Sequence, residues 1–239
     1  MVNNFMAALL SWTPYLLGGL GWNVLITVMA VLLGTCVGAV FAWIRISKDG
    51  GVLGLIARET AKVFRNVPTL AFLFFVVFVF PREFAIPGTD WVVTIPLWVK
   101  AIVGMCASVI GFTSESLVVA YHDWKRSDYE ASLLFVSTWS NSVTISFLAS
   151  STISLIGVGE LISRTNTVIS VVGTWVMIPM YIYAGMYFVL VSLLWAMIVK
   201  RIRRARWLTE LPGRLKTRME ERSLHLKNSM PNESRDLQA

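Results

Sequence analysis

The chain has 239 residues, of which 56% are hydrophobic and only 15% are charged. A soluble domain carries roughly 25% charged residues, so this composition, with a mean hydropathy of +0.66, excludes an ordinary water-soluble enzyme. The formal net charge is +7, but the basic residues gather at the ends of apolar segments. That pattern is typical of contact with membrane lipid and not of a nucleic-acid-binding face. We therefore predict an all-α integral membrane protein with no nucleic-acid partner.

The first third of the chain predicts two spanning helices. Residues 3–17 are mostly apolar and predict a short interfacial helix, broken by the glycine-rich stretch 18–21. Residues 22–44 contain no charge and, at about 1.5 Å per residue, are long enough to cross the hydrocarbon core. A mixed polar segment at 45–65 leads into an amphipathic turn, and the Phe-rich run at 69–80 completes the second helix.

The rest of the chain predicts three more spanning helices. A hydrophilic link with turn residues at 82–93 and a polar loop at 122–129 separate the apolar segments. These segments lie at 94–121, 143–158 and 168–199. In the last of them we expect bends at Pro179 and Gly185.

The distribution of Lys and Arg predicts the topology. Twelve of these residues lie in the segments 45–65, 122–129 and 200–206, against three on the opposite side of the predicted spans. The positive-inside rule places the basic side in the cytoplasm, so we expect the N-terminus outside and the C-terminus inside. This orientation requires an odd number of spans and agrees with about five. A transmembrane domain over 1–206 would then precede a polar, basic cytoplasmic tail over 207–239.

The sequence contains none of the common motifs for a metalloprotease, a nucleophile elbow, a P-loop or a dinucleotide site. We therefore predict no catalytic residues, no metal site and no cofactor on this chain. Energy for any active process would have to come from a partner or from an ion gradient.

Glu115 is the main charged residue within a predicted spanning helix, where a charge is costly and marks a functional candidate. With its neighbours Thr113 and Ser114, it would line a translocation path or pair with another helix. Because His122 is only seven residues away, solvation near the cytoplasmic end stays an alternative. A second polar group would line a path, or would bond to helix carbonyls and join helices: Ser150, Ser151 and Thr152.

Four segments occur in a recognisable order. Residues 21–27 read G-W-N-V-L-I-T, and residues 64–70 read F-R-N-V-P-T-L and precede an apolar run. Glu115 and Glu130 stand fifteen residues apart, and residues 156–161 read I-G-V-G-E-L. Together these segments resemble the permease subunits of polar amino acid ABC importers, over about residues 18–205. The matching motif positions include Arg65, Asn66, Pro68, Thr69, Gly157 and Glu160.

The resemblance implies a type I ABC importer permease-like fold in a bacterial inner membrane. It implies that the chain forms the translocation path for a polar amino acid or a related small solute. A second permease subunit, two ATPase subunits and an extracytoplasmic solute-binding protein would be its partners. ATP and Mg²⁺ would be bound by the ATPase, and this chain would not be an enzyme.

The resemblance also implies an ATPase-coupling segment within the loop 122–140. The family's coupling motif reads E-A-A followed, after three residues, by Gly, whereas this chain has Glu130-Ala131-Ser132 and then Val136. The stretch that follows the motif in the family is shorter here by roughly twenty residues. Gly accepts positive φ where Val does not, so Val136 implies a continuous helix or a displaced turn. We therefore expect a heterodimer, in which a companion permease supplies the regular coupling motif. Tyr129, Leu133 and Val136 would share one helical face. The expected coupling residues are Asp128, Tyr129, Glu130, Ala131, Ser132, Leu133 and Val136.

Two other functions stay open from the sequence. A permease relative that has lost transport would act as a structural subunit, and the shortened coupling region favours this reading. A stand-alone secondary transporter would need ion-coupling groups inside the membrane, of which only Glu115 qualifies.

Overall fold

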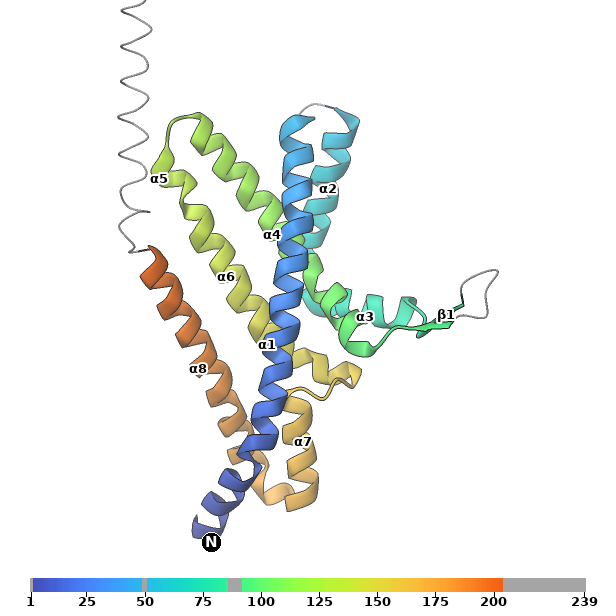
Figure 1. The fold of residues 1–239 in the computed structure, drawn as a ribbon, viewed down its shortest axis with the longest axis vertical. Helices are drawn as coiled ribbons and strands as arrows, with labels where there is room; N and C mark the ends of the chain where they lie inside the picture. The colour runs from blue at the N-terminus through green and yellow to red at the C-terminus, as the bar shows by residue number, and fades with distance from the viewer. Residues whose placement is uncertain (1, 49–50, 86–91, 204–239) are drawn as a thin grey trace, which may run out of the picture.

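The longest helix, α1 (Val2–Ser47), runs the full length of the molecule (Figure 1). The computed structural model describes residues 2–48, 51–85 and 92–203. The predicted interfacial helix over 3–17 is wrong, because α1 continues through Pro14 and through Gly18, Gly19 and Gly21. The physical reason is close packing: a Cβ added to Gly19 would lie 2.8 Å from the Cα of Leu161. This glycine admits a neighbouring helix and does not end its own.

The predicted second span consists of two helices at a sharp angle. Helix α2 (Val52–Asn66) and helix α3 (Thr69–Val79) meet at 103°. Val67 and Pro68 have extended backbone between them, as expected because proline disfavours helical conformation in the residue before it. Helix α3 therefore lies across the long axis and projects sideways (Figure 1).

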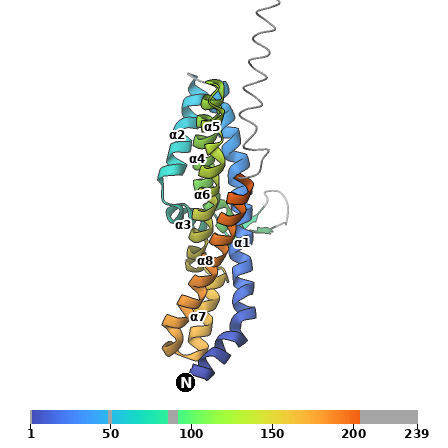
Figure 2. The ribbon, with the colours of Figure 1, turned by 90° about the vertical axis from the view of Figure 1, so that its left-hand side faces the viewer.

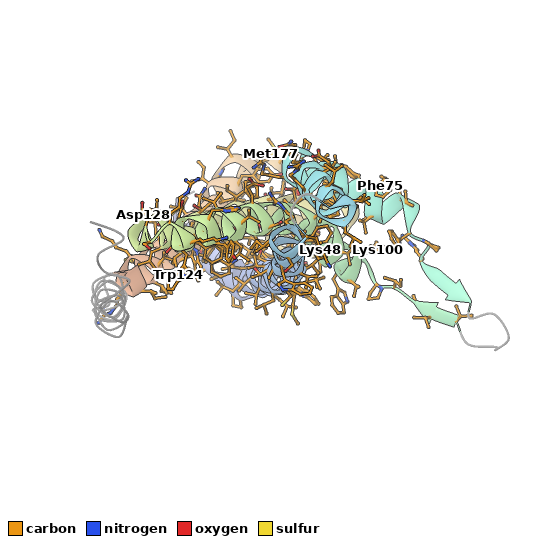
Figure 3. All side chains as sticks on the ribbon, turned by 90° about the horizontal axis from the view of Figure 1, so that it is seen from above. Lys48, Phe75, Lys100, Trp124, Asp128 and Met177 are labelled. Carbon is orange, nitrogen blue, oxygen red and sulfur yellow. The ribbon has the colours of Figure 1, made fainter. Side chains whose placement is uncertain are left out.

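The polar link that follows forms a small hairpin. Strand β1 (Glu83–Ala85) pairs antiparallel with strand β2 (Val92–Thr94), with Glu83 opposite Thr94. The hairpin extends outward from the helices, as the view from above shows (Figure 3). The predicted third helix began at Thr94, but α4 spans Leu97–Lys125 because Thr94 belongs to β2 and Pro96 caps the helix.

The fourth predicted span begins earlier than residue 143. A short helix, α5 (Tyr129–Ser132), is followed by α6 (Leu134–Ala149) and by the 3₁₀ helix η1 (Ser150–Ile156). Gly157 then adopts φ +87°, a left-handed conformation that ends η1. Helix α7 (Leu161–Val172) continues at an angle of 49°.

The fifth predicted span, 168–199, is interrupted near its start. Gly173 has φ +116° and separates α7 from the 3₁₀ helix η2 (Thr174–Val176) and from α8 (Met177–Arg203). Pro179 and Gly185 both lie within α8, which continues through them. Pro179 is tolerated because it stands in the first turn of α8, where a missing N–H breaks no internal hydrogen bond.

Two hydrophobic clusters hold the helices together. One joins α1, α3, α4 and η1 through residues that include Ile26, Leu73, Met105 and Ile153. The other joins α1, α6, α7 and α8, and includes Leu16, Leu161, Met180 and Phe188. In the side view the molecule is narrow, and α1, α4, α6 and α8 all run along its long axis (Figure 2).

The helices match the dimensions of a membrane. In the described part of the chain, three helices are long and apolar enough to cross a bilayer, or up to five if each bent pair counts as one span. Large apolar side chains face outward, such as Ile182, Met186 and Leu193 on α8, where lipid can cover them. The chain is an all-α, multi-pass membrane protein.

Candidate functional site

Glu115 belongs to an ion cluster between three helices. Arg45 on α1 places Nη2 3.0 Å from Glu115 Oε2, and its Nη1 donates a 3.0 Å hydrogen bond to Ser114 Oγ. Arg65 on α2 approaches the same carboxylate at 3.9 Å. The side chain of Arg45 is 9% exposed and that of Glu115 is 35% exposed. Glu115 therefore pairs with neighbouring helices and keeps one side open.

The burial of Arg45 makes its ion pair with Glu115 important for stability. Arg45 is too deeply buried to be solvated alone, and removing one member of a buried ion pair typically costs about 3–5 kcal/mol. Because Glu115 is 35% exposed, water replaces part of the interaction, and we expect this pair to contribute less than that scale. No basic residue adjoins Glu115 in the sequence. Its partner Arg45 lies seventy positions earlier, so the pairing is visible only in the fold.

Thr113 lies beside Glu115 in sequence but belongs to the α1–α4 contact. It is 1% exposed, and a Cβ added to Gly38 would lie 2.8 Å from Thr113 Cβ. Its Oγ1 is buried without a hydrogen-bond partner in the described residues. Thr113 thus packs between helices and does not face any cavity described below.

Glu160 lies at the centre of a second, fully buried polar network. Its carboxylate accepts hydrogen bonds of 2.9 Å from the backbone N–H groups of Ile162 and Ser163, so it caps the N-terminus of α7. A negative group at this position satisfies unpaired N–H donors and interacts favourably with the helix dipole. Asn23 on α1 donates a further 2.9 Å hydrogen bond to Glu160 Oε2.

Asn23 uses both ends of its amide in this network. Its Nδ2 also donates to Ser150 Oγ at 2.9 Å, while its Oδ1 accepts from the backbone N–H of Leu161 at 3.0 Å. Asn23, Ser150 and Glu160 are all 0% exposed. Sequence reasoning placed Asn23 only within a motif and missed this role. The signal was present as an amide side chain inside an uncharged apolar run.

The Ser and Thr residues around η1 are used locally. The hydroxyls of Ser150, Ser151 and Thr152 donate to the carbonyls of Phe147, Leu148 and Ala149, at 2.6, 2.9 and 2.7 Å respectively. Such bonds satisfy a hydroxyl within its own helix. Ser150 also accepts the hydrogen bond from Asn23 on α1. It therefore joins two helices, which was one of the two roles that the sequence left open for this group.

The segment around Arg65 forms the corner between α2 and α3. Asn66 is the last residue of α2, and Pro68 stands at the N-cap of α3, with Thr69 as its first residue. The corner sits close to α4, because a Cβ on Gly111 would meet the backbone N of Arg65 at 2.5 Å. The structure brings Arg65 to Glu115, but it places Glu160 and Gly157 in the separate network at η1 and α7.

The expected coupling segment consists of a tight turn, the short helix α5 and the first turn of the longer helix α6. Ser127 has φ +64°, and Asp128 Oδ1 accepts a 3.0 Å hydrogen bond from the backbone N–H of Ala131, capping α5. Leu133 alone separates α5, which ends at Ser132, from α6, and its backbone stays helical. The sharp turn therefore precedes α5, and Val136 lies inside α6. The side chains of Tyr129 and Glu130 are outside the described part of the structure.

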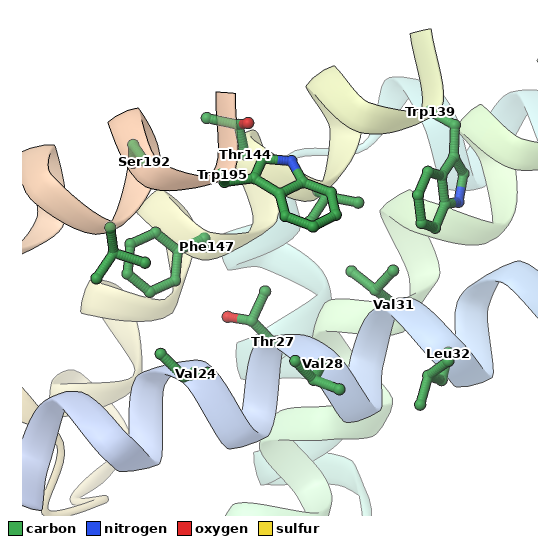
Figure 4. Close-up of a pocket in the computed structure, with 12 residues that line it drawn as sticks. Val24, Thr27, Val28, Val31, Leu32, Trp139, Thr144, Phe147, Ser192 and Trp195 are labelled. Atoms are coloured by element: carbon green, nitrogen blue, oxygen red, sulfur yellow. The ribbon is translucent and has the colours of Figure 1, made fainter. Parts of the chain in front are cut away.

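A cavity of about 310 Å³ lies between α1, α6 and α8 (Figure 4). Trp139 and Trp195 stand at one side of it, with ring centroids 6.5 Å apart, and Ser192 Oγ is buried there without a partner in the described residues. The remaining lining is apolar apart from two threonines: Val24, Thr27, Val28, Val31, Leu32, Val143, Thr144, Phe147 and Val191. Such a lining offers few groups that could hold a charged ligand.

A comparison with known proteins supports the fold. No family model matches the chain, and no curated protein matches it. A solved structure, described as the crystal structure of an amino acid ABC transporter with histidines, matches with a TM-score of 0.68 and 17% sequence identity. The match covers 83% of this chain and 97% of the other. The chain therefore has the fold of that ABC transporter chain, as the sequence motifs predicted.

Proposed function

We propose that this chain is a transmembrane permease subunit of an ABC importer. In this role it forms part of the translocation path for a polar amino acid or a related small solute. The observation that carries the proposal is the likeness to the amino acid ABC transporter over 83% of the chain. The motif positions support it, since Glu160 and Gly157 define the corner between η1 and α7.

The proposal assigns energy supply to other chains. The sequence holds no nucleotide motif, so two ATPase subunits would bind ATP and Mg²⁺, and a solute-binding protein would deliver the solute. The segment from Asp128 to Val136 would dock on the ATPase, and closure of the ATPases would move it as a rigid element. Its position at the α4–α5 turn supports this assignment, because the turn forms one extremity of the molecule (Figure 1).

The proposed location is a bacterial inner membrane, with the N-terminus outside and the C-terminus in the cytoplasm. The twelve-to-three asymmetry of basic residues supports it. The tail after residue 203 lies outside the described residues. Labelling of a cysteine placed at Ser223 in intact cells should fail from the outside, and external labelling would reverse the orientation.

We also propose that the chain works with a different permease chain as its partner. Support comes from Ser132 and Val136, which replace the second Ala and the Gly of the family's coupling motif, so a companion would supply the regular docking element. Glu130→Ala in this chain should then reduce solute-stimulated ATP hydrolysis less than the matching change in the companion. Equal loss in both, or a functional complex with this permease alone, would contradict the heterodimer.

Purification of the native complex tests the function itself. The full chain, isolated in mild detergent, should bring a second permease and an ATPase with it, and ATP hydrolysis should require the ATPase. The chain alone should be inactive. A complex with both partners but no ATP-dependent transport would favour the structural-subunit alternative. The secondary transporter is disfavoured because Arg45 already neutralises the carboxylate of Glu115.

A further inference from the structure

A second cavity, of about 600 Å³, lies where α1, α2 and α4 come together beyond the ion cluster. Four of its lining side chains are basic: Arg45, Arg58, His122 and Lys125. None of the described lining residues carries a carboxyl group. We propose that this cavity binds the phosphate headgroup of an anionic phospholipid. The proposal rests on the chain being a membrane protein with the proposed orientation, and it does not depend on a function in transport.

The basic side chains differ in how far they are already neutralised. Arg45 is paired with Glu115 at 3.0 Å, and Arg58 lies 3.4 Å from Glu59. Glu59 also pairs with Lys62 at 2.8 Å, so its charge is shared. The side chain of Lys125 is exposed and makes no hydrogen bond or ion pair within the described ranges. The cavity therefore keeps uncompensated positive charge for a phosphate.

The apolar surface beside the cavity favours a lipid over a soluble anion. Val52 and Leu55 line the cavity and are 75% and 49% exposed, and their neighbours Leu53 and Ile56 are 62% and 59% exposed. A free phosphate would leave this surface in water, whereas an acyl chain would cover it. An amphipathic helix with basic residues next to apolar ones is typical of the membrane interface.

The location is also the right one for an acidic headgroup. Positive-inside reasoning places the α1–α2 turn at the cytoplasmic leaflet, where anionic lipids are concentrated. Basic pockets between membrane helices on that side are common sites for such headgroups. Gly51 and Gly54 also line the cavity and contribute no side-chain bulk there.

Lipid competition measured by native mass spectrometry tests the proposal. The delipidated full chain is offered equal amounts of phosphatidylglycerol and phosphatidylcholine. We expect bound phosphatidylglycerol to dominate, and we expect Arg58→Gln with Lys125→Gln to reduce that preference by about tenfold. Lys200→Gln with Arg201→Gln removes the same charge from the end of α8, outside the cavity, and should leave the preference unchanged.

The remaining outcomes each decide the question. The variant Arg58→Lys with Lys125→Arg keeps both charges. If it keeps the preference for phosphatidylglycerol, and circular dichroism is unchanged in every variant, a headgroup site is supported. Equal loss in the α8 control would show general surface charge and overturn it. If glycerol phosphate competes as well as the lipid, the cavity binds a soluble phosphate and the lipid proposal is overturned. Absence of any lipid preference, with Lys125 cross-linking to a soluble subunit instead, would identify a protein contact and overturn it as well.

Discussion

The two polar clusters of this protein connect distant helices in opposite ways. Around Glu160, three fully buried side chains and three backbone N–H groups satisfy one another completely. Around Glu115, charged side chains meet at a half-open surface, and Arg65 is no closer than 3.9 Å. A closed network inside a membrane protein must satisfy every donor, because no water can do so. An open cluster can tolerate imperfect geometry and remain adjustable.

The closed network should show the largest loss on mutation. Glu160→Ala removes the cap of α7 and leaves Asn23 Nδ2 without one acceptor, which together should cost about 2–4 kcal/mol. Glu160→Gln keeps one acceptor oxygen and should cost less. Thermal unfolding of the purified chain in detergent measures both. Glu59→Ala, at an exposed carboxylate, is the control, and an equally small shift in all three variants would show that the network does not stabilise the fold.

The packing beneath the open cluster should be the next most sensitive feature. Gly111→Ala places a Cβ 2.5 Å from the backbone N of Arg65, so it must push α2 away from α4, at a cost of about 1–3 kcal/mol. Gly185→Ala is the matched control, since nothing lies within 4 Å of the added Cβ. Melting temperatures should fall for the first variant only. Two unchanged values would mean that α2 does not approach α4 this closely.

The ion pair itself should give the smallest effect. A double-mutant cycle with Arg45→Gln and Glu115→Gln should give a coupling energy of about 1 kcal/mol, toward the lower part of the range for contacting residues. Partial exposure of Glu115 lets water replace part of the interaction. Addition of salt should reduce this coupling, whereas the effect of Glu160→Ala should not respond to salt. A coupling near zero would mean that Arg45 is held by Ser114 instead.

The sequence predicted the elements that depend on local pattern. The uncharged stretch 22–44 lies within α1 as predicted. The single second helix was wrong, because the chain breaks at Pro68 between α2 and α3. Predictions also failed where the role of a residue depends on a tertiary contact. Gly18, Gly19 and Gly21 looked like a helix break, yet Gly19 serves contact with Leu161, and no rule of local propensity contains that partner.

The candidate site was predictable to a similar degree. Glu115 stood out as a charged residue within an apolar segment and Glu160 only as a motif position, and both form interhelical contacts. Their partners, Arg45 and Asn23, lie seventy and 137 positions away in sequence. Only the fold brings them together. Thr113 and Ser150 could not be distinguished from path-lining residues by composition, because their burial depends on which face α1 covers.

Uptake into proteoliposomes tests the proposed function most directly. The purified complex is reconstituted with its solute-binding protein and labelled amino acids outside, and with ATP on the side of the ATPase. We predict accumulation of a polar amino acid that requires this chain and ATP, and that stops when a hydrolysis-deficient ATPase is used. Accumulation that persists when this chain is omitted, or that continues without ATP hydrolysis, would contradict the account.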